Sequence, residues 1–452
     1  MKKILHISLF LLLASTGAMG EPAGSAARKG PFVLLISVDG LKPEAITHAA
    51  EHGLKVPNLR ALMADGTYAS TVRGVLPTVT YPSHSTLLTG ASPAAHGIYD
   101  NTTFDPFNRN ERGWYWYAED LKVPTLWDAA AGAHLITANV YWPVSVGAHI
   151  TYNLPQIWRT GTADDLKLQR ALSTPGLEQS LSATLGRYPG GEEETVAEDE
   201  IRARFAVRLM EQKHLDFFTV YLSGLDTEEH ASGPFSPASN AVLERLDTAV
   251  GELRAAAEKA APGRATVCVV SDHGFAAIQH DVNLYVPFLQ AGLFSVDAHN
   301  KITAWKAMPW PAGGTAAIML ADPDDVAVRD RVQALLTQLA ADPASGIERI
   351  LSRDEIHAMR GFPDASFVVA FRIGYEIAYE LSPPLITKPS NLGMHGYLPE
   401  KAEMRSAFFL AGPGIAKNRN LGEIDMRQIA PTLADILRVH LAAAEMAGIA
   451  IQ

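Results

Sequence analysis

Short apolar runs alternate with amphipathic segments along this chain, and this alternation constrains its fold more than any other feature. Strand-like runs occupy residues 32–38, 216–222 and 265–270, and helical patterns follow the first two at 56–64 and 237–260. Such alternation predicts a mostly parallel sheet with helices on both faces. In sheets of this kind, ligands bind beyond the carboxyl ends of the strands. We therefore predict an α/β fold whose functional side chains follow its strands.

The pattern changes in the second half of the chain. Between residues 275 and 390, proline and glycine are frequent, and we expect an amphipathic helix at 326–339 and a strand at 366–373. We predict that 275–390 is an inserted subdomain. Residues 30–274 and 391–436 would then together form the catalytic domain.

The first twenty residues have the features of an export signal. Lys2 and Lys3 form a basic start, residues 9–14 are an unbroken apolar run, and small residues end the segment at Gly20. A buried N-terminal helix is the alternative, but the apolar run is short. We predict a signal peptide at 1–20 and a periplasmic or secreted protein.

Cysteine and charge counts narrow the range of partners. Cys268 is the single thiol, so no disulfide forms within the chain, and no cysteine stands at the expected cleavage site to carry a lipid. Beyond the signal, no segment reaches the ~20 apolar residues that span a bilayer, so we expect no stable membrane anchor. Cleavage removes two of 38 basic residues and none of 49 acidic ones, which leaves a net charge of about −13. That charge disfavours a nucleic-acid polymer as partner, and the sequence leaves the oligomeric state open.

Carboxylate and imidazole side chains follow three predicted strands. Asp39 comes directly after the first strand, and Asp272 and His273 come after the third. Asp226 and His230 follow the second, with a spacing that puts both on one face of a helical turn. Taken singly, each residue could be a turn residue, a cap or a salt-bridge partner.

A further histidine, His395, stands between two glycines in Gly-Met-His-Gly-Tyr. Flanking glycines let the backbone approach other groups closely, although a lone histidine there could be a turn residue. Together with the residues above, it makes a set of three aspartates and three histidines with no cysteine. This mixture suits two zinc-like ions at a catalytic rather than a structural site.

The candidate nucleophile is Thr80. Pro82 suits the first turn of a helix, so Thr80 would lie at the helix N-terminus, where the dipole and free amides favour an alkoxide or a bound phosphate. Threonine is also a common ordinary cap. Thr78, Ser83 and Ser85 are chemically possible rivals.

Taken in order, these residues resemble the nucleotide pyrophosphatase/phosphodiesterase family of the alkaline phosphatase superfamily. The resemblance spans residues 32–436 and rests on six motifs: Asp39, Thr80 in Thr-Tyr-Pro-Ser-His, Asn101 in His-Gly-Ile-Tyr-Asp-Asn, the Asp226/His230 pair, Asp272-His273-Gly274, and His395 in Gly-Met-His-Gly-Tyr. It implies an alkaline-phosphatase-like three-layer sandwich and a zinc-dependent hydrolase of phosphodiester or pyrophosphate bonds.

The resemblance also implies two Zn²⁺ per chain and a role for each site residue. The implied ligands are Asp226, His230 and His395 for one ion, and Asp39, Thr80, Asp272 and His273 for the other. Thr80 would be the nucleophile as well as a ligand, and a threonyl-phosphate would form. Asn101 and the backbone amide of Tyr81 would bind a non-bridging phosphoryl oxygen. Residues 101–103 also fit a glycosylation sequon, but an active-site asparagine would be a poor acceptor.

A diester is favoured over a monoester by two further observations. Residues 142–145, Trp-Pro-Val-Ser, resemble the diesterase branch, and the Lys-x-Arg pair of threonine-dependent monoesterases is absent from 130–156. A single neutral donor, Asn101, suits one negative charge better than two. Tyr81 could stack on a nucleobase or serve only in packing, and Trp158 is a candidate for the opposite wall. The expected partner is a small phosphodiester or a nucleotide.

Two departures and three alternatives stand beside this interpretation. Glu229 precedes His230, where the family commonly has glycine. The segment between His273 and His395 does not follow the family's sequence, so the preferred leaving group stays open. Choline phosphodiesters are among the candidates. The alternatives are a phosphomonoesterase, a phosphonoacetate-type hydrolase of the same superfamily, and a non-catalytic exported binding protein. The last predicts the loss of a metal ligand, and none is lost.

Overall fold

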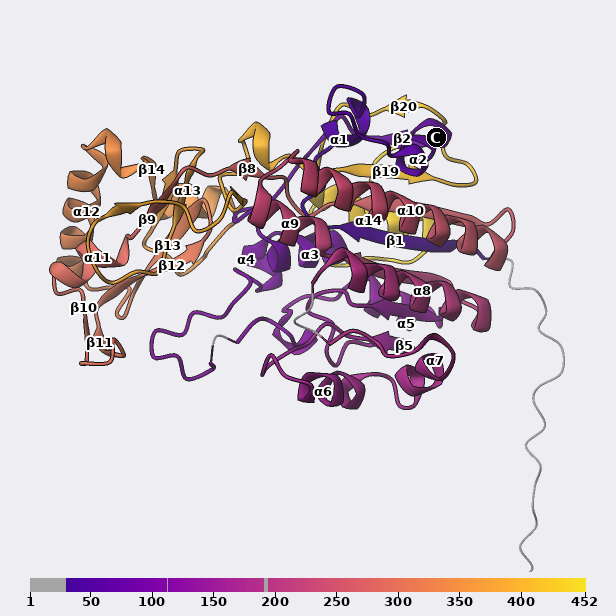
Figure 1. The fold of residues 1–452 in the computed structure, drawn as a ribbon, viewed down its shortest axis with the longest axis horizontal. Coiled ribbons are helices and arrows are strands. Elements are labelled where there is room, and N and C mark those ends of the chain that lie inside the picture. Colours follow the sequence, from indigo (N-terminus) through magenta and orange to yellow (C-terminus); the bar gives the residue numbers. More distant parts are fainter. Residues whose placement is uncertain (1–29, 112, 191–193) are drawn as a thin grey trace, which may run out of the picture. The chain divides into compact units, whose positions relative to one another are not determined.

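An eight-stranded sheet with the order β20-β2-β19-β7-β1-β6-β4-β5 forms the centre of the protein (Figure 1). The computed structural model describes residues 30–111, 113–190 and 194–452, so the predicted signal peptide lies outside the described residues. Strands β7, β1, β6, β4 and β5 run parallel, β19 is antiparallel to β7 and to β2, and β20 runs parallel to β2. The strands are β1 (Phe32–Val38), β2 (Thr67–Tyr68), β4 (Thr137–Val140), β5 (Tyr152–Leu154), β6 (Phe217–Leu222), β7 (Ala265–Val270), β19 (Phe408–Ala411) and β20 (Arg419–Asn420).

Helices cover both faces of this sheet, as the alternating sequence pattern predicts. On one face, α8 packs on α10, and both contact the central strands; α2 and α9 pack on α10. On the other face, α14 contacts β1 and packs on α3 and α5. The helices are α2 (Pro57–Asp65), α3 (Thr80–Thr89), α5 (Leu126–Gly132), α8 (Val196–Gln212), α9 (Gly224–Ser232), α10 (Pro237–Ala260) and α14 (Ile429–Leu437). The result is the three-layer α/β arrangement expected from the sequence.

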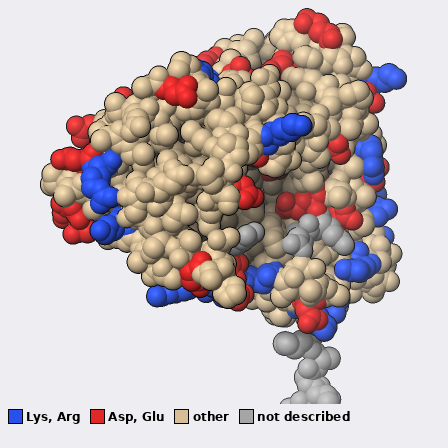
Figure 2. Space-filling model, turned by 60° about the vertical axis from the view of Figure 1, so that its left-hand side comes forward, with Lys and Arg blue, Asp and Glu red and all other residues tan. Residues whose placement is uncertain are grey.

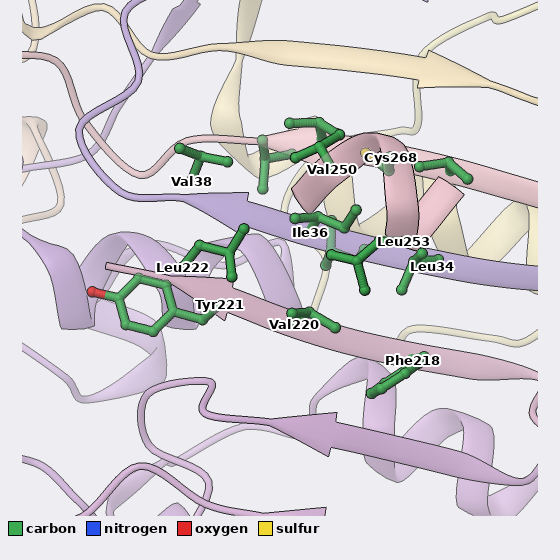
Figure 3. Close-up of a cluster of buried hydrophobic side chains, with 14 of the residues drawn as sticks. Leu34, Ile36, Val38, Phe218, Val220, Tyr221, Leu222, Val250, Leu253 and Cys268 are labelled. Carbon is green, nitrogen blue, oxygen red and sulfur yellow. The ribbon is translucent and has the colours of Figure 1, made fainter. Parts of the chain in front are cut away.

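The central strands are apolar because both of their faces are covered. Every residue of β1, β6 and β7 is buried, as strands between two helical layers must be. Figure 3 shows Ile36 of β1, Val220 of β6 and Leu253 of α10 in this core. Cys268 lies in it as a free, buried thiol, and burial raises the pKa of that thiol.

A second, antiparallel sheet lies between residues 307 and 371. Its strand order is β12-β13-β15-β14; the buried residues of one hydrophobic cluster lie within 282–377, and a second cluster also includes Leu76, Val79 and Leu398. The elements of this region are β12 (Ala307–Ala312), β13 (Thr315–Leu320), α12 (Val326–Ala340), β14 (Ile347–Ser352), α13 (Arg353–Ala358) and β15 (Phe367–Phe371). The predicted helix at 326–339 and strand at 366–373 correspond to α12 and β15.

Short elements connect the two sheets. Strand β8 (Ala276–Ala277) pairs antiparallel with β18 (Gly393–Met394), so the two ends of the intervening segment meet beside the main sheet. Residues 31–452 form one unit by their contacts, and the predicted boundaries of the inserted subdomain stay a prediction. None of the described helices is long and apolar enough to cross a membrane. The remaining elements are α1 (Glu44–Thr47), β3 (Thr71–Arg73), α4 (Pro93–His96), α6 (Asp164–Leu172), α7 (Leu177–Leu185), β9 (His280–Val282), α11 (Tyr285–Gln290), β10 (Phe294–Val296), β11 (Ile302–Trp305), β16 (Tyr375–Ile377), β17 (Ile386–Thr387) and β21 (Glu423–Asp425).

Candidate functional site

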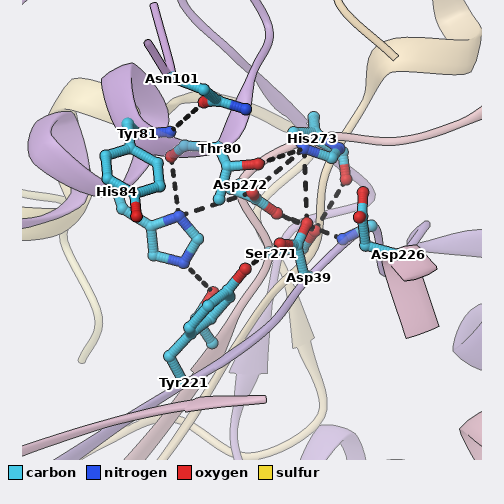
Figure 4. A network of polar contacts seen from close by, with 12 residues as sticks. Asp39, Thr80, Tyr81, His84, Asn101, Tyr221, Asp226, Ser271, Asp272 and His273 are labelled. Atoms are coloured by element: carbon cyan, nitrogen blue, oxygen red, sulfur yellow. Dashed lines mark hydrogen bonds and ion pairs between the residues drawn. The ribbon is translucent and has the colours of Figure 1, made fainter. Parts of the chain in front are cut away.

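The carboxyl ends of β7, β1 and β6, which are neighbours in the sheet, bring the predicted acidic residues together. Asp39 follows β1, Asp272 and His273 follow β7, and Asp226 lies in the first turn of α9 after β6. Figure 4 shows these side chains pointing toward one another. The sheet order therefore collects residues that are up to 234 positions apart, as Asp39 and His273 are.

The first donor group consists of Asp226, His230 and His395. One ligand atom of each lies within 4.8 Å of the others, and the Nε2 atoms of His230 and His395 are 3.5 and 3.6 Å from Asp226 Oδ1. The Nδ1–H of His230 donates to the carbonyl of Gly393 at 2.9 Å. Because that bond fixes the proton on Nδ1, the lone pair of Nε2 faces Asp226 and is free to bind a cation.

The second donor group surrounds His273. Its Nε2 is 3.4 Å from Asp39 Oδ1, 3.2 Å from Asp272 Oδ2 and 3.4 Å from Thr80 Oγ1. Ligand atoms of Asp39, His273 and Asp226 also lie within 4.8 Å of one another. Asp226 therefore lies between the two donor groups.

The pKa values of these residues are shifted because ionisable groups lie buried and close together. Burial, together with the neighbouring carboxylates of Asp272 and Asp226, raises the pKa of Asp39 well above its usual value. Burial also raises the pKa of Asp272 to about 7 and lowers the pKa of His395 to about 4. Unaided, the protein would resist holding both Asp39 and Asp272 ionised at this point.

The residues fit bound metal ions. Asp39 Oδ1, Asp226 Oδ1 and Asp272 Oδ2 are buried oxygens without a hydrogen-bond partner. Unpaired buried carboxylate oxygens are costly, and divalent cations would compensate them. Oxygen and imidazole donors without thiolate are the ligands of catalytic zinc and similar metals.

Thr80 is the first residue of α3 and points at the second donor group. Val79 precedes it in an extended conformation and gives the helix no side-chain cap. The hydroxyl of Thr80 contacts His273 Nε2, so it does not serve as a cap. His84, one turn later, anchors the helix start: its Nδ1–H donates to Thr80 O at 2.8 Å, and its Nε2 accepts from Ser37 Oγ on β1 at 2.9 Å.

The three rival hydroxyls lie elsewhere. Thr78 Oγ1 donates to the carbonyl of Tyr397 at 2.7 Å. Ser83 and Ser85 are buried within α3, and neither lines the cavity described below. Of these four candidates, Thr80 alone faces the donor groups.

Asn101 and Tyr81 contact each other beside Thr80. The backbone N–H of Tyr81 donates to Asn101 Oδ1 at 2.9 Å, and the Tyr81 hydroxyl donates to Gln156 Oε1 at 2.7 Å. The amide of Tyr81, expected from the resemblance to bind substrate directly, is thus satisfied by Asn101. The carboxamide N–H₂ of Asn101 is left to face a ligand.

The donor groups open into a cavity of about 380 Å³. Figure 2 shows a hollowed face of the molecule where acidic side chains gather. Trp114 lines the cavity, whereas Trp158 lies behind it with ring centroids 5.2 Å apart. Lining residues that sequence reasoning did not find are Trp114, Gln156, Glu194, Tyr221, Thr227 and Asn391.

Two further carboxylates lie beside the donor groups. Glu194 Oε1 accepts hydrogen bonds from Tyr141 at 3.1 Å and Gln156 at 3.0 Å, and burial raises its pKa to about 7. Glu229 fills the space over Gly40, where a Cβ would lie 3.1 Å from its Oε2. The departure from the family pattern at Glu229 therefore places a buried carboxylate behind the turn that carries Asp39.

Comparisons with known proteins find related sequences. A model of the type I phosphodiesterase/nucleotide pyrophosphatase family matches residues 33–398. Human ectonucleotide pyrophosphatase/phosphodiesterase family member 1 is 27% identical over 266 residues, which are 57% of this chain and 25% of that protein. A venom phosphodiesterase of Crotalus durissus collilineatus is 27% identical over 274 residues, 59% of this chain and 29% of its own length. The alignments thus span about a quarter of the length of these curated relatives.

Solved structures share the fold. Human ectonucleotide pyrophosphatase/phosphodiesterase 5 superposes with a TM-score of 0.65 at 20% identity, over 90% of this chain and 95% of that chain. An inactive variant of its murine counterpart, solved in complex with AMP, superposes with a TM-score of 0.62 at 18% identity, over 91% and 96%.

Proposed function

From the premise that this chain belongs to the type I phosphodiesterase/nucleotide pyrophosphatase family, and is a hydrolase of that family, we propose that it is an exported, zinc-dependent phosphodiesterase that acts through Thr80. The observation that carries the proposal is the hydroxyl of Thr80 at the start of α3, facing buried oxygens that lack partners. The substrate is a small phosphodiester or a nucleotide.

The metal ligands follow from the two donor groups. One Zn²⁺ would be held by Asp226, His230 and His395, and the other by Asp39, Thr80, Asp272 and His273. When bound, two such ions lower the pKa of a nucleophilic hydroxyl and neutralise charge that develops on phosphoryl oxygens.

The chain's own residues supply nucleophile and orientation. Thr80 Oγ1 loses its proton to solvent and attacks phosphorus, the new Oγ1–P bond replaces the bond to the leaving oxygen, and that oxygen departs with a proton from solvent. Water then attacks phosphorus, the Oγ1–P bond breaks, and the hydroxyl regains its proton. The N-terminus of α3 stabilises negative charge at this point. Asn101 donates its carboxamide N–H to a non-bridging oxygen, while the Tyr81 amide holds it in place.

The lining of the cavity favours a diester. Among the described residues that line it, none is lysine or arginine, so the hydrogen-bond donors outside the metal ligands, Asn101 among them, are all neutral. Neutral donors suit a monoanionic diester better than a dianionic monoester.

The carboxylate of Glu194 makes choline phosphodiesters candidate substrates. It lines the cavity with Trp114 and Tyr81, and a carboxylate beside aromatic rings favours a neutral or cationic substrate group over a further anion. Choline phosphodiesters are therefore a second substrate class beside nucleotides, and AMP in the murine relative supports the first.

Export is proposed from the sequence alone. Residues 1–20 have the basic start, apolar run and small-residue end of a signal peptide. The mature protein would be periplasmic or secreted.

A substrate panel tests the proposed function. We expect zinc-loaded protein to hydrolyse bis(p-nitrophenyl) phosphate at least ~10²-fold faster, in kcat/KM, than p-nitrophenyl phosphate, since a site whose donors are all neutral stabilises a single charge better than two. The panel extends to nucleotide pyrophosphates, glycerophosphocholine and phosphonoacetate. An equal or reversed preference would contradict the diesterase assignment, and no turnover of any member by fully loaded protein would favour a non-catalytic binding protein.

A further inference from the structure

An ion pair within α8 lies directly behind the start of α9. Asp199 and Arg202 are both fully buried, and Arg202 Nη1 donates to Asp199 Oδ1 at 2.9 Å. Neither residue lines the cavity. A buried ion pair has a large desolvation cost and is weak evidence for stability in itself. Stability alone therefore does not account for this pair.

Asp199 acts as the N-terminal cap of α9 although it belongs to another helix. The first residue of α9 is Gly224, and its backbone N–H donates to Asp199 Oδ2 at 2.7 Å. Ser223, the residue in the cap position, makes no side-chain cap bond. A Cβ at Gly224 would lie 2.5 Å from the backbone nitrogen of Val196, so the start of α9 abuts the start of α8.

The capped helix carries two of the proposed metal ligands. Asp226 is the third residue of α9, and His230 follows one turn later. Both ligands lie on the same helix, so the anchor of its first turn fixes where they lie. The free backbone N–H groups at the start of a helix need a hydrogen-bond acceptor. Asp199 supplies that acceptor.

Arg202 links this cap to the other donor group. Its guanidinium lies 3.6 Å from the centroid of the Tyr141 ring, and Tyr141 stacks on Tyr221 at 5.9 Å and 11°. The hydroxyl of Tyr221 donates to Asp39. Arg202 thus contacts the cap of α9 on one side and an aromatic pair that ends at Asp39 on the other.

We propose that Asp199 and Arg202 are positioning residues that hold the first turn of α9 so that Asp226 and His230 meet His395 around one metal ion. The inference rests on the proposed function in one respect, that Asp226 and His230 are metal ligands. Groups that orient metal ligands from behind typically change metal affinity 10- to 100-fold when they are removed.

The chain contains a matched control, Asp247 on α10. It is buried like Asp199 and caps another helix, α2, through Asp247 Oδ1 to the N–H of Leu59 at 2.7 Å and Oδ2 to the N–H of Asn58 at 3.1 Å. Helix α2 carries no residue of either donor group. A change at Asp247 therefore reports the cost of losing a buried cap without the metal site.

The test compares Asp199→Asn with Asp247→Asn in the full chain. In each variant one carboxylate oxygen becomes an N–H₂ group, which cannot accept from the donor it faced. Zn²⁺ dissociation constants are measured by competition with a chromophoric chelator, and Tm is measured on the same samples. We expect both variants to lose Tm, Asp199→Asn to weaken one of two zinc sites at least ~10-fold, and Asp247→Asn to change zinc affinity less than ~2-fold.

The inference is overturned if the two variants weaken zinc binding equally at a similar loss of Tm. If Asp199→Asn does not fold, Arg202→Lys carries the test, since it keeps the charge but loses the planar fork and the ring contact. We then expect zinc affinity at one site to fall at least ~3-fold relative to Asp247→Asn, and an unchanged affinity would overturn the inference. Because zinc binding is measured without substrate, wild-type protein that binds zinc but hydrolyses no diester would contradict the proposed function and leave this inference standing.

Discussion

At the scale of single residues, surroundings rather than chemical type separate Thr80 from its rivals. The hydroxyl of Thr78 is engaged by a backbone carbonyl, and Ser83 and Ser85 are buried in the body of α3. A hydroxyl becomes a nucleophile only where its alkoxide is stabilised. Thr80 has that environment because its helix begins at the edge where β1 and β7 end.

Asn101 is the residue whose change is most informative about phosphoryl binding. We expect Asn101→Ala to lower kcat for bis(p-nitrophenyl) phosphate by ~10²- to 10³-fold, because loss of one donor to developing charge costs about 2–4 kcal/mol. Asn101→Asp keeps an acceptor for the Tyr81 amide but replaces the donor with a charge, so it should be at least as impaired. The zinc content of both variants should equal that of wild type. Near-normal turnover by Asn101→Asp would show that Asn101 acts only by holding Tyr81.

At the scale of elements, the sequence predicted the central sheet well. Strands β1, β6 and β7 are long apolar runs, and each is followed within four residues by a candidate ligand, so local pattern and site position coincide. The prediction that Thr80 starts a helix is confirmed by α3.

Features that depend on contacts between distant elements were not predicted. Asp199 lies 25 residues from the Gly224 amide that it caps, and no local motif marks such a cap. Glu194 and Asn391 line the cavity from loops, and the hydrophobic periodicity of a sequence does not predict the path of a loop. Trp114, rather than Trp158, lines the cavity because the aromatic cluster packs with Trp158 behind it.

A buried histidine joins α4 to α3 and gives the fold a pH dependence. His96 Nδ1 accepts from the N–H of Ile98 at 3.1 Å, so its Nε2–H donates to Thr86 Oγ1 at 3.1 Å and the ring is neutral. Burial lowers its pKa to about 3, whereas the unfolded chain has a pKa of about 6.5. Below about pH 6.5 the unfolded state therefore binds one more proton than the folded state, and stability falls as the pH falls.

The expected size of this effect is measurable. Between pH 7.5 and 5.5, wild-type protein should lose about 1.4 kcal/mol more free energy of unfolding than His96→Gln, because the variant lacks the proton that the unfolded chain takes up. Denaturant unfolding at several pH values gives both curves. Parallel curves would mean that His96 does not stay neutral in the folded protein.

At the scale of the whole molecule, a long segment returns to the site it leaves. The chain departs from the main sheet after His273, builds the second sheet, and comes back through β18 to place His395. The first donor group is therefore complete only when both ends of this segment are in place. Metal binding and the pairing of β8 with β18 should stabilise one another, since a ligand that binds only the folded protein stabilises it.

The most direct test of the central claim compares wild-type protein with Thr80→Ala at equal, measured zinc content. With bis(p-nitrophenyl) phosphate as substrate, we expect Thr80→Ala to lose at least ~10³-fold in kcat, because no other hydroxyl faces the donor groups among the described α3 candidates. Thr80→Ser, which keeps the hydroxyl, should retain measurable turnover. If Thr80→Ala with full zinc content retains turnover within tenfold of wild type, Thr80 is not the nucleophile and the proposed mechanism is wrong.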